Sequence, residues 1–148
     1  MRLATKLLGI ALWLVIPPAL AQRILGDLLD SGAKKLAGDE VKQELVQRVI
    51  VGPTATGGNI ELMYVSNGLI QGKGNNPQLT GSNVLIDLSG DWTIEDSGKF
   101  CTSMRIAAVG PSSGINRCQF WFKYKDQYFL ADSDTDRQAR VLRRTIKQ

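Results

Sequence analysis

The clearest indication of the fold class is the stretch Gln119-Phe120-Trp121-Phe122-Lys123-Tyr124-Lys125-Asp126-Gln127-Tyr128-Phe129-Leu130-Ala131. Phe120, Phe122 and Tyr124 stand at every second position of its first half, and successive side chains of a strand point to opposite faces of a sheet. The triplet Lys125-Asp126-Gln127 then interrupts the pattern before a second aromatic run. The stretch therefore predicts two antiparallel strands joined by a short reversal.

Similar short strands, separated by turn residues, are predicted on both sides of this hairpin. The turns are Ser66-Asn67-Gly68, Ser89-Gly90-Asp91 and Asp96-Ser97-Gly98, and the glycine-containing stretches 72–77 and 110–114 are predicted to be loops. Between them we expect strands at residues 60–64, 69–71, 84–88, 92–95, 100–106 and 139–146. Short strands with short reversals predict an antiparallel β-meander curled into a partial or small barrel.

The segment before these strands has a helical pattern. Ile24, Leu25, Leu28 and Leu29 form one apolar stripe, and a second stripe, after a glycine-containing break, contains Val41, Leu45, Val46 and Val49. Asp39 is a suitable N-cap and Gly52-Pro53 a suitable stop. We therefore predict an α+β protein, with short helices in residues 22–52 and an antiparallel β domain in residues 53–148.

The first 21 residues have the layout of a secretory signal peptide. Arg2 and Lys6 precede an uncharged apolar run from Leu7 to Ile16, and Ala19-Leu20-Ala21 forms an A-x-A cleavage site. The apolar run is far shorter than the roughly 20 residues that cross a bilayer. We expect cleavage before Gln22 and a periplasmic or secreted bacterial protein without a membrane span.

Composition excludes several kinds of chemistry. The 148 residues include no histidine, so catalysis by Ser-His-Asp or Cys-His groups and metal ligation by imidazole are excluded. The formal net charge is +4, and removal of residues 1–21 takes away two of the positive charges. Overall charge therefore indicates little about partners. We expect no nucleic acid among them, because an exported protein meets little nucleic acid.

Two cysteines in an exported chain predict one disulfide, between Cys101 and Cys118. Closing a loop of this size could stabilise the fold by about 3 kcal/mol. The absence of a C-x-x-C spacing argues against redox catalysis and against a cysteine metal site.

No complete catalytic or metal-binding set stands in the sequence. Asp132-Ser133-Asp134-Thr135-Asp136 opens like an EF-hand loop, but Arg137 and Arg143 occupy positions that need Gly and Glu, so an acidic turn is favoured. Carboxylates for glycoside hydrolysis would have to come from Glu61, Asp87, Asp91, Glu95 or Asp96. We predict no catalytic residue, no metal and no cofactor.

Two groups of residues are candidates for binding a partner. Alternation places Phe120, Phe122 and Tyr124 on one face and Trp121, Lys123 and Lys125 on the other. The first set is expected in the core, whereas the second could stack a base or a sugar ring. The alternative is that Trp121 packs under a neighbouring loop, and we favour it.

The second group is the basic C-terminal segment. The last twelve residues contain Arg137, Arg140, Arg143, Arg144 and Lys147 and no acidic residue, so the arginines could dock an acidic partner. Alternation places Arg140, Leu142, Arg144 and Ile146 on one face and Ala139, Val141, Arg143 and Thr145 on the other. Neither face is therefore purely apolar. An edge strand protected by charge fits this pattern best.

Several motifs together resemble a largely uncharacterised family of small exported proteobacterial proteins, over roughly residues 51–131. The motifs are Asn67-Gly68, Gly90-Asp91-Trp92-Thr93-Ile94, Gly98-Lys99-Phe100-Cys101, Cys118-Gln119-Phe120-Trp121 and Asp126-Gln127-Tyr128-Phe129. The resemblance implies a signal peptide, a disulfide and a small antiparallel barrel. It carries over no catalytic residue.

The step Gly90-Asp91-Trp92 also resembles the G-x-W of lipocalins, which lies at the start of their first strand. In this chain it lies beyond the middle. We therefore do not expect a full eight-stranded, ligand-enclosing barrel in that order.

These observations predict a non-enzymatic binding protein of unknown ligand, holding a protein or glycan partner on a sheet face or loop edge. The alternative is an inhibitor or immunity protein whose 110–114 loop, tethered between the cysteines, blocks an envelope-directed hydrolase. An enzyme acting through carboxylates is the third hypothesis. The oligomeric state stays open.

Overall fold

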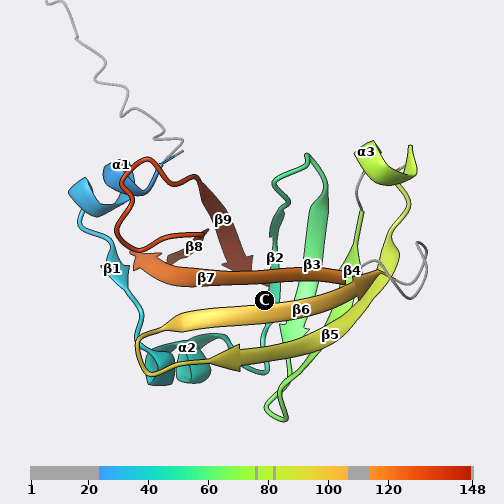
Figure 1. The fold of residues 1–148 in the computed structure, drawn as a ribbon, viewed down its shortest axis with the longest axis horizontal. Coiled ribbons are helices and arrows are strands. Elements are labelled where there is room, and N and C mark those ends of the chain that lie inside the picture. Colours follow the sequence, from blue (N-terminus) through green and yellow to red (C-terminus); the bar gives the residue numbers. More distant parts are fainter. Residues whose placement is uncertain (1–23, 76, 82, 107–113, 148) are drawn as a thin grey trace, which may run out of the picture.

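Consecutive strands of the chain close into an antiparallel barrel in the computed structural model (Figure 1). The structure describes residues 24–75, 77–81, 83–106 and 114–147, and eight strands of this part form the ring. Their bounds are β2 Val49–Pro53, β3 Asn59–Tyr64, β4 Leu69–Gly74, β5 Ile86–Ile94, β6 Lys99–Ile106, β7 Gly114–Tyr124, β8 Gln127–Ala131 and β9 Val141–Ile146. Each strand pairs with the next along the chain, and β9 pairs with β2 to close the barrel.

This architecture confirms the predicted α+β class with an antiparallel barrel. The barrel is closed rather than partial, because β9 reaches β2 through the pairs Ile50↔Ile146 and Val51↔Thr145. The G-x-W step nevertheless differs in place from that of lipocalins, since Trp92 lies in β5, at the middle of the meander.

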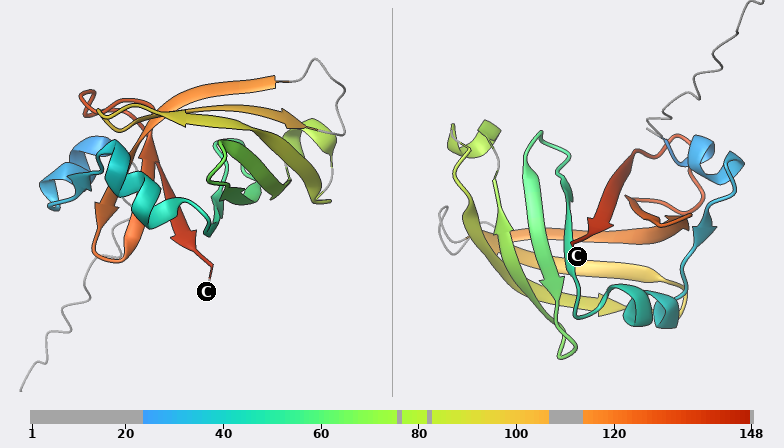
Figure 2. Two further views of the ribbon diagram at one scale, coloured as in Figure 1. Left: turned by 90° about the horizontal axis from the view of Figure 1, so that it is seen from below. Right: turned by 180° about the vertical axis from the view of Figure 1, so that it is seen from behind.

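Within the described residues, three short helices and one short strand accompany the barrel. They are α1 Leu25–Asp30, β1 Lys34–Lys35, α2 Gly38–Leu45 and α3 Pro77–Thr80. Strand β1 pairs with β7 through Lys34↔Lys123 and Lys35↔Phe122. Helix α3 lies on the opposite side of the molecule from α1 and α2 (Figures 1 and 2).

Helix α2 contributes to the core inside the barrel. Its apolar residues Val41 and Leu45 are fully buried and share a cluster with Leu62, Tyr64 and Phe100 of the barrel strands. The helix lies beside the turn from β5 to β6 (Figure 1), where the Gly38 N–H donates to the Asp96 carbonyl over 3.3 Å. One end of the barrel is thus covered by α2.

Helix α1 packs on the outside of the barrel. Leu25 and Leu28 are fully buried against Phe122, Phe129 and Val141, which belong to β7, β8 and β9. The amides of Leu25 and Gly26 each donate to a carbonyl of the segment before β9, over 2.8 Å. The predicted apolar stripe of this helix therefore has its expected role in the core.

The helical segment ends earlier than predicted. Helix α2 stops at Leu45, and Val49–Pro53 forms strand β2 of the barrel, so the β domain begins before residue 53. The run Val49-Ile50-Val51 is β-branched, which favours a strand once two neighbours are available for pairing. The N-cap is Ala37 rather than Asp39, and its amide donates to Glu40 Oε2 over 2.8 Å.

Two glycine-containing stretches that were predicted to leave the sheet belong to it. Gly72-Lys73-Gly74 forms the end of β4, and Ser89-Gly90-Asp91 lies inside the continuous strand β5. A Cβ on Gly90 would lie 2.0 Å from the Ser103 carbonyl oxygen. This glycine is therefore required by the close approach of the neighbouring strand rather than by a turn.

Strand β9 is not an edge strand, contrary to the prediction. It lies between β2 and β8 and pairs with both. The face of β9 that carries Leu142, Arg144 and Ile146 is directed into the barrel. Its arginine is therefore an interior residue and not a charge that protects an edge.

Candidate functional site

The barrel encloses a cavity of ≈ 190 Å³. Its wall is largely apolar and is drawn from strands far apart in the sequence. The apolar side chains of the wall include Ile60, Leu62, Leu88, Met104, Leu130 and Leu142. Ile115 lies at the mouth, where 37% of the residue is exposed. Such a wall favours a ligand that is itself mostly apolar.

Both charged residues in the described cavity wall are arginines, Arg117 and Arg144. Arg117 is exposed, whereas Arg144 is only 5% exposed. No aspartate or glutamate of the described chain lines the cavity. The interior is therefore electropositive as well as apolar.

Arg144 is a buried cation without a carboxylate partner among the residues that the structure describes. Its Nη1 donates to the carbonyl oxygens of Pro53 (2.6 Å) and Arg143 (2.9 Å). Its Nε is buried and has no acceptor among the described residues. Burial lowers the pKa of the Arg144 guanidinium, because desolvation penalises the charged form.

Gly52 of β2 provides the space for this side chain. A Cβ at that position would lie 2.9 Å from Arg144 Nη1 and 3.1 Å from Arg144 Cδ. It would also lie 2.5 Å from the Arg143 carbonyl oxygen. The pairing of β2 with β9 thus places a residue without a side chain beside the buried guanidinium.

Tyr64 of β3 lines the same cavity. Its phenol is buried, and burial raises its pKa to about 12 although the positive charge of Arg144 acts in the opposite direction. Tyr64 is therefore a neutral hydroxyl at physiological pH.

The candidate Trp121 lies in the core rather than on a binding surface. It is 0% exposed, and its ring meets Tyr64 and Phe100 edge to face at centroid distances of 6.3 and 6.1 Å. Its Nε1 is buried, and no described residue accepts a hydrogen bond from it. A base or sugar ring cannot stack on Trp121 in this conformation.

Lys123 and Lys125 have separate surroundings. Lys123 forms an ion pair with Glu44 of α2, with an Nζ to Oε2 distance of 2.6 Å. Lys125 lies in the β7–β8 turn with φ = 53°, and its Nζ stands 5.2 Å from the Tyr124 ring centroid. The two lysines do not form one surface with Trp121.

The C-terminal arginines are also divided by the fold. Arg137 pairs with Asp30 of α1 at 2.6 Å, and Arg140 Nη1 donates to the Ala55 carbonyl over 3.4 Å. Arg143 is exposed, whereas Arg144 lies inside the barrel. A docking patch made of all four arginines is not formed.

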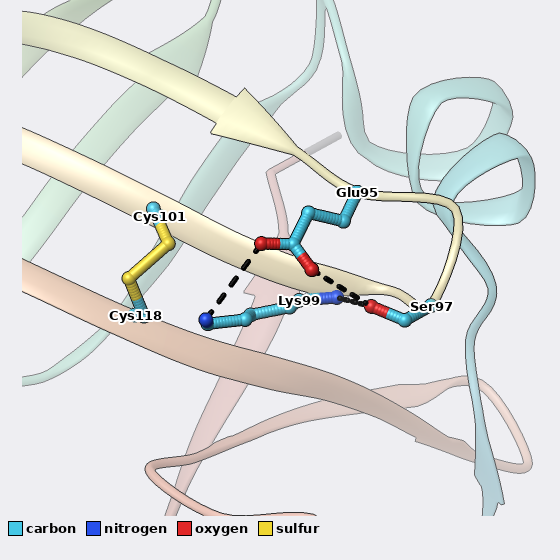
Figure 3. Close-up of a disulfide and its surroundings, with 5 residues drawn as sticks. All are labelled: Glu95, Ser97, Lys99, Cys101 and Cys118. Atoms are coloured by element: carbon cyan, nitrogen blue, oxygen red, sulfur yellow. Dashed lines mark hydrogen bonds and ion pairs between the residues drawn. A yellow bond between two sulfur atoms is a disulfide. The ribbon is translucent and has the colours of Figure 1, made fainter.

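The predicted disulfide is confirmed. Cys101 of β6 and Cys118 of β7 are directly opposed in the sheet, with a Cα to Cα distance of 4.0 Å and an S–S bond. Figure 3 shows it near the turn that leads into β6, where Lys99 pairs with Glu95 at 3.7 Å. The cross-link joins two strands of the cavity wall.

Several acidic residues in the described part of the chain form turns or ion pairs. Asp136 Oδ1 accepts from the Gln138 amide and Asp134 pairs with Lys35, as in the predicted acidic turn. No cluster of three or more metal-ligating side chains is present among the described residues. Glu61 pairs with Lys147 and lies outside the cavity wall.

Two predicted features lie outside the described residues. They are the signal peptide with its cleavage site before Gln22, and the 110–114 loop, of which only Gly114 is described, as the first residue of β7.

Comparison with protein-family models, with curated proteins and with solved structures gave no match. Within the described residues, no helix is both long and apolar enough to cross a membrane. The fold and the site together define a closed antiparallel barrel with an apolar, cationic interior.

The sequence interpretation selected Arg144 for a surface role and did not select Gly52, Tyr64 or Arg117. The alternation places Arg144 on the same strand face as Leu142 and Ile146. An arginine beside these apolar residues indicates a buried cation. The partner strands that show this face to be internal could not be identified from the residues alone.

Proposed function

We propose that this chain is an exported, non-enzymatic binding protein that holds a small, mostly apolar ligand inside its barrel. The observation that carries the proposal is the ≈ 190 Å³ cavity with its apolar wall. Eight-stranded barrels have an interior wide enough for side chains or for one small ligand. Apolar cavities of this order hold small organic molecules.

Export is supported by the predicted signal peptide and by the Cys101–Cys118 disulfide, because disulfides persist in oxidising compartments. Intact-mass measurement of the protein recovered from the periplasm or medium tests this part. We expect a mature chain that begins at Gln22. A product that retains residues 1–21 would contradict export by cleavage.

A protein or glycan partner bound on the Trp121 face has less support, because the Trp121 ring is buried. The inhibitor alternative depends on the 110–114 loop, and no observation on the described residues favours it. The cavity is therefore the site to test first.

Calorimetric titration with 1-octanol, a neutral molecule of suitable size, tests occupancy of the cavity. We expect saturable one-to-one binding by the mature protein. The variant Ile115→Trp places a larger side chain at the mouth, and we expect it to weaken octanol binding at least tenfold.

Leu69→Trp is the matched control. Leu69 and Ile115 are both large apolar residues of similar exposure, 40% and 37%, but Leu69 does not line the cavity. Equal loss of binding in both variants would overturn the proposed function, and so would failure of the wild-type protein to bind either octanol or its carboxylate analogue octanoate.

A further inference from the structure

Resting on the proposed function, we infer that the ligand is an apolar monocarboxylate whose anionic group pairs with Arg144 inside the barrel. The first step concerns the charge. Arg144 lies within an apolar cavity wall, 5% exposed, and no carboxylate of the described chain neutralises it. A buried charge without a counter-charge is costly, so an anionic ligand would gain from supplying the missing partner.

The second step concerns hydrogen-bonding capacity. A guanidinium has five N–H donors, arranged in a planar fork that suits a carboxylate. The bonds from Arg144 to Pro53 and Arg143 both leave from Nη1, and the buried Nε has no acceptor in the part of the chain that the structure describes. The side chain is therefore anchored at one nitrogen and retains a donor for a further group.

The third step concerns how the position is built. Gly52 leaves open the space that Arg144 occupies, since a Cβ there would stand 2.9 Å from Nη1. Leu142, two residues before Arg144 on the same strand, belongs to the apolar wall. A ligand with an anionic end and an aliphatic body would match Arg144 at one end and Leu142, Leu130 and Met104 along the body.

A comparison of octanoate with 1-octanol tests this assignment, because the two probes share an aliphatic chain and differ in charge. We expect the wild-type protein to bind octanoate at least tenfold more tightly than octanol at neutral pH. In Arg144→Met we expect the two affinities to differ by less than twofold, with octanol binding retained. Arg143→Met is the matched control, since Arg143 neighbours Arg144 on β9 but is exposed, and we expect it to keep the wild-type preference.

A second measurement does not depend on the folding of a variant. In the wild-type protein, octanoate should shift the NMR signal of the Arg144 Nε–H, whereas octanol should shift it much less. Raising the salt concentration should reduce octanoate affinity less than twofold, because a pair inside the barrel is poorly screened.

The possible failures are distinguishable. If neither probe binds, the proposed function is wrong and this assignment falls with it. If octanol binds as tightly as octanoate in the wild-type protein, the cavity binds ligands but Arg144 does not select an anion. If Arg143→Met removes the preference as Arg144→Met does, a surface charge is responsible and the assignment is overturned.

Discussion

Lys123 in the barrel wall and Glu44 on helix α2 form an ion pair with an Nζ to Oε2 distance of 2.6 Å. The Tyr128 hydroxyl donates to the same carboxylate oxygen, also over 2.6 Å. Two neighbouring strands, β7 and β8, are thereby joined to the helix that covers one end of the barrel. Lys123, which the sequence indicated as a candidate binding residue, instead holds α2 against the barrel.

The pH dependence of stability should reveal this pair. Burial disfavours the Glu44 carboxylate, but the hydrogen bonds from Lys123 and Tyr128 outweigh it and lower its pKa below the ordinary 4.5. Its stabilisation is therefore complete above about pH 4.5, the ordinary value, and is lost as the pH falls through the lower native pKa. Glu44→Gln should cost about 0.5 to 1 kcal/mol at pH 7 and less at pH 3, measured by urea unfolding.

At alkaline pH, the contribution of the pair to stability changes with pH in the opposite direction. The hydrogen bond to Glu44 raises the pKa of Lys123 above its ordinary 10.5, so its stabilisation is present below that value and is lost as the pH rises through the native pKa.

An equal cost of Glu44→Gln at pH 3 and pH 7 would contradict the pair. Glu95→Gln is a suitable control, because the Glu95–Lys99 pair is longer, 3.7 Å, and more exposed.

Loss of the disulfide should destabilise the barrel wall. Replacing both Cys101 and Cys118 by Ser should lower the free energy of unfolding by about 2 to 4 kcal/mol, since the cross-link restricts the unfolded chain. Urea unfolding with and without reductant measures the effect. Reductant should shift the wild-type curve and leave that of the double variant unchanged; a wild-type curve insensitive to reductant would refute the contribution.

Arg144→Met is expected to fold without loss of stability in the absence of ligand. The change removes an unpaired buried cation, which offsets the loss of its bonds to the Pro53 and Arg143 carbonyls. Replacement of buried ionic groups by apolar ones of similar volume is often neutral or stabilising by about 1 to 4 kcal/mol. For comparison, Leu62→Ala in the same wall should cost about 2 to 5 kcal/mol. A cost for Arg144→Met as large as that for Leu62→Ala would show that Arg144 serves the fold.

Burial of Trp121 can be checked by fluorescence. Trp92 is 8% exposed and donates from Nε1 to the Val65 carbonyl over 2.9 Å, so Trp92→Phe leaves Trp121 as the reporter in the mature chain. Iodide, which does not enter a packed core, should quench this variant weakly in the folded state and strongly in urea. Strong quenching in the folded state would return Trp121 to the candidates for surface binding.

Local patterns in the sequence predicted much of the fold because they depend only on neighbouring residues. The alternation around Trp121 and the turn after Tyr124 correspond to the β7–β8 hairpin, and the stripe of Leu25 and Leu28 corresponds to a packed helix. The disulfide was also predictable, because a chain with two cysteines has one possible intramolecular pairing. In each case the prediction needed only the pattern of one strand or helix, or the one possible pair of cysteines.

Closure of the barrel was decided by the tertiary structure. Val49–Pro53 joined the preceding helical pattern in the sequence, yet pairing with β3 and β9 made it a strand. Alternation showed that Trp121 and Arg144 each share a face with particular residues, but it could not show which face is internal, because that depends on which distant strands complete the ring. The placement of Arg144 over Gly52 required the register between β2 and β9, a contact between residues at opposite ends of the barrel sequence.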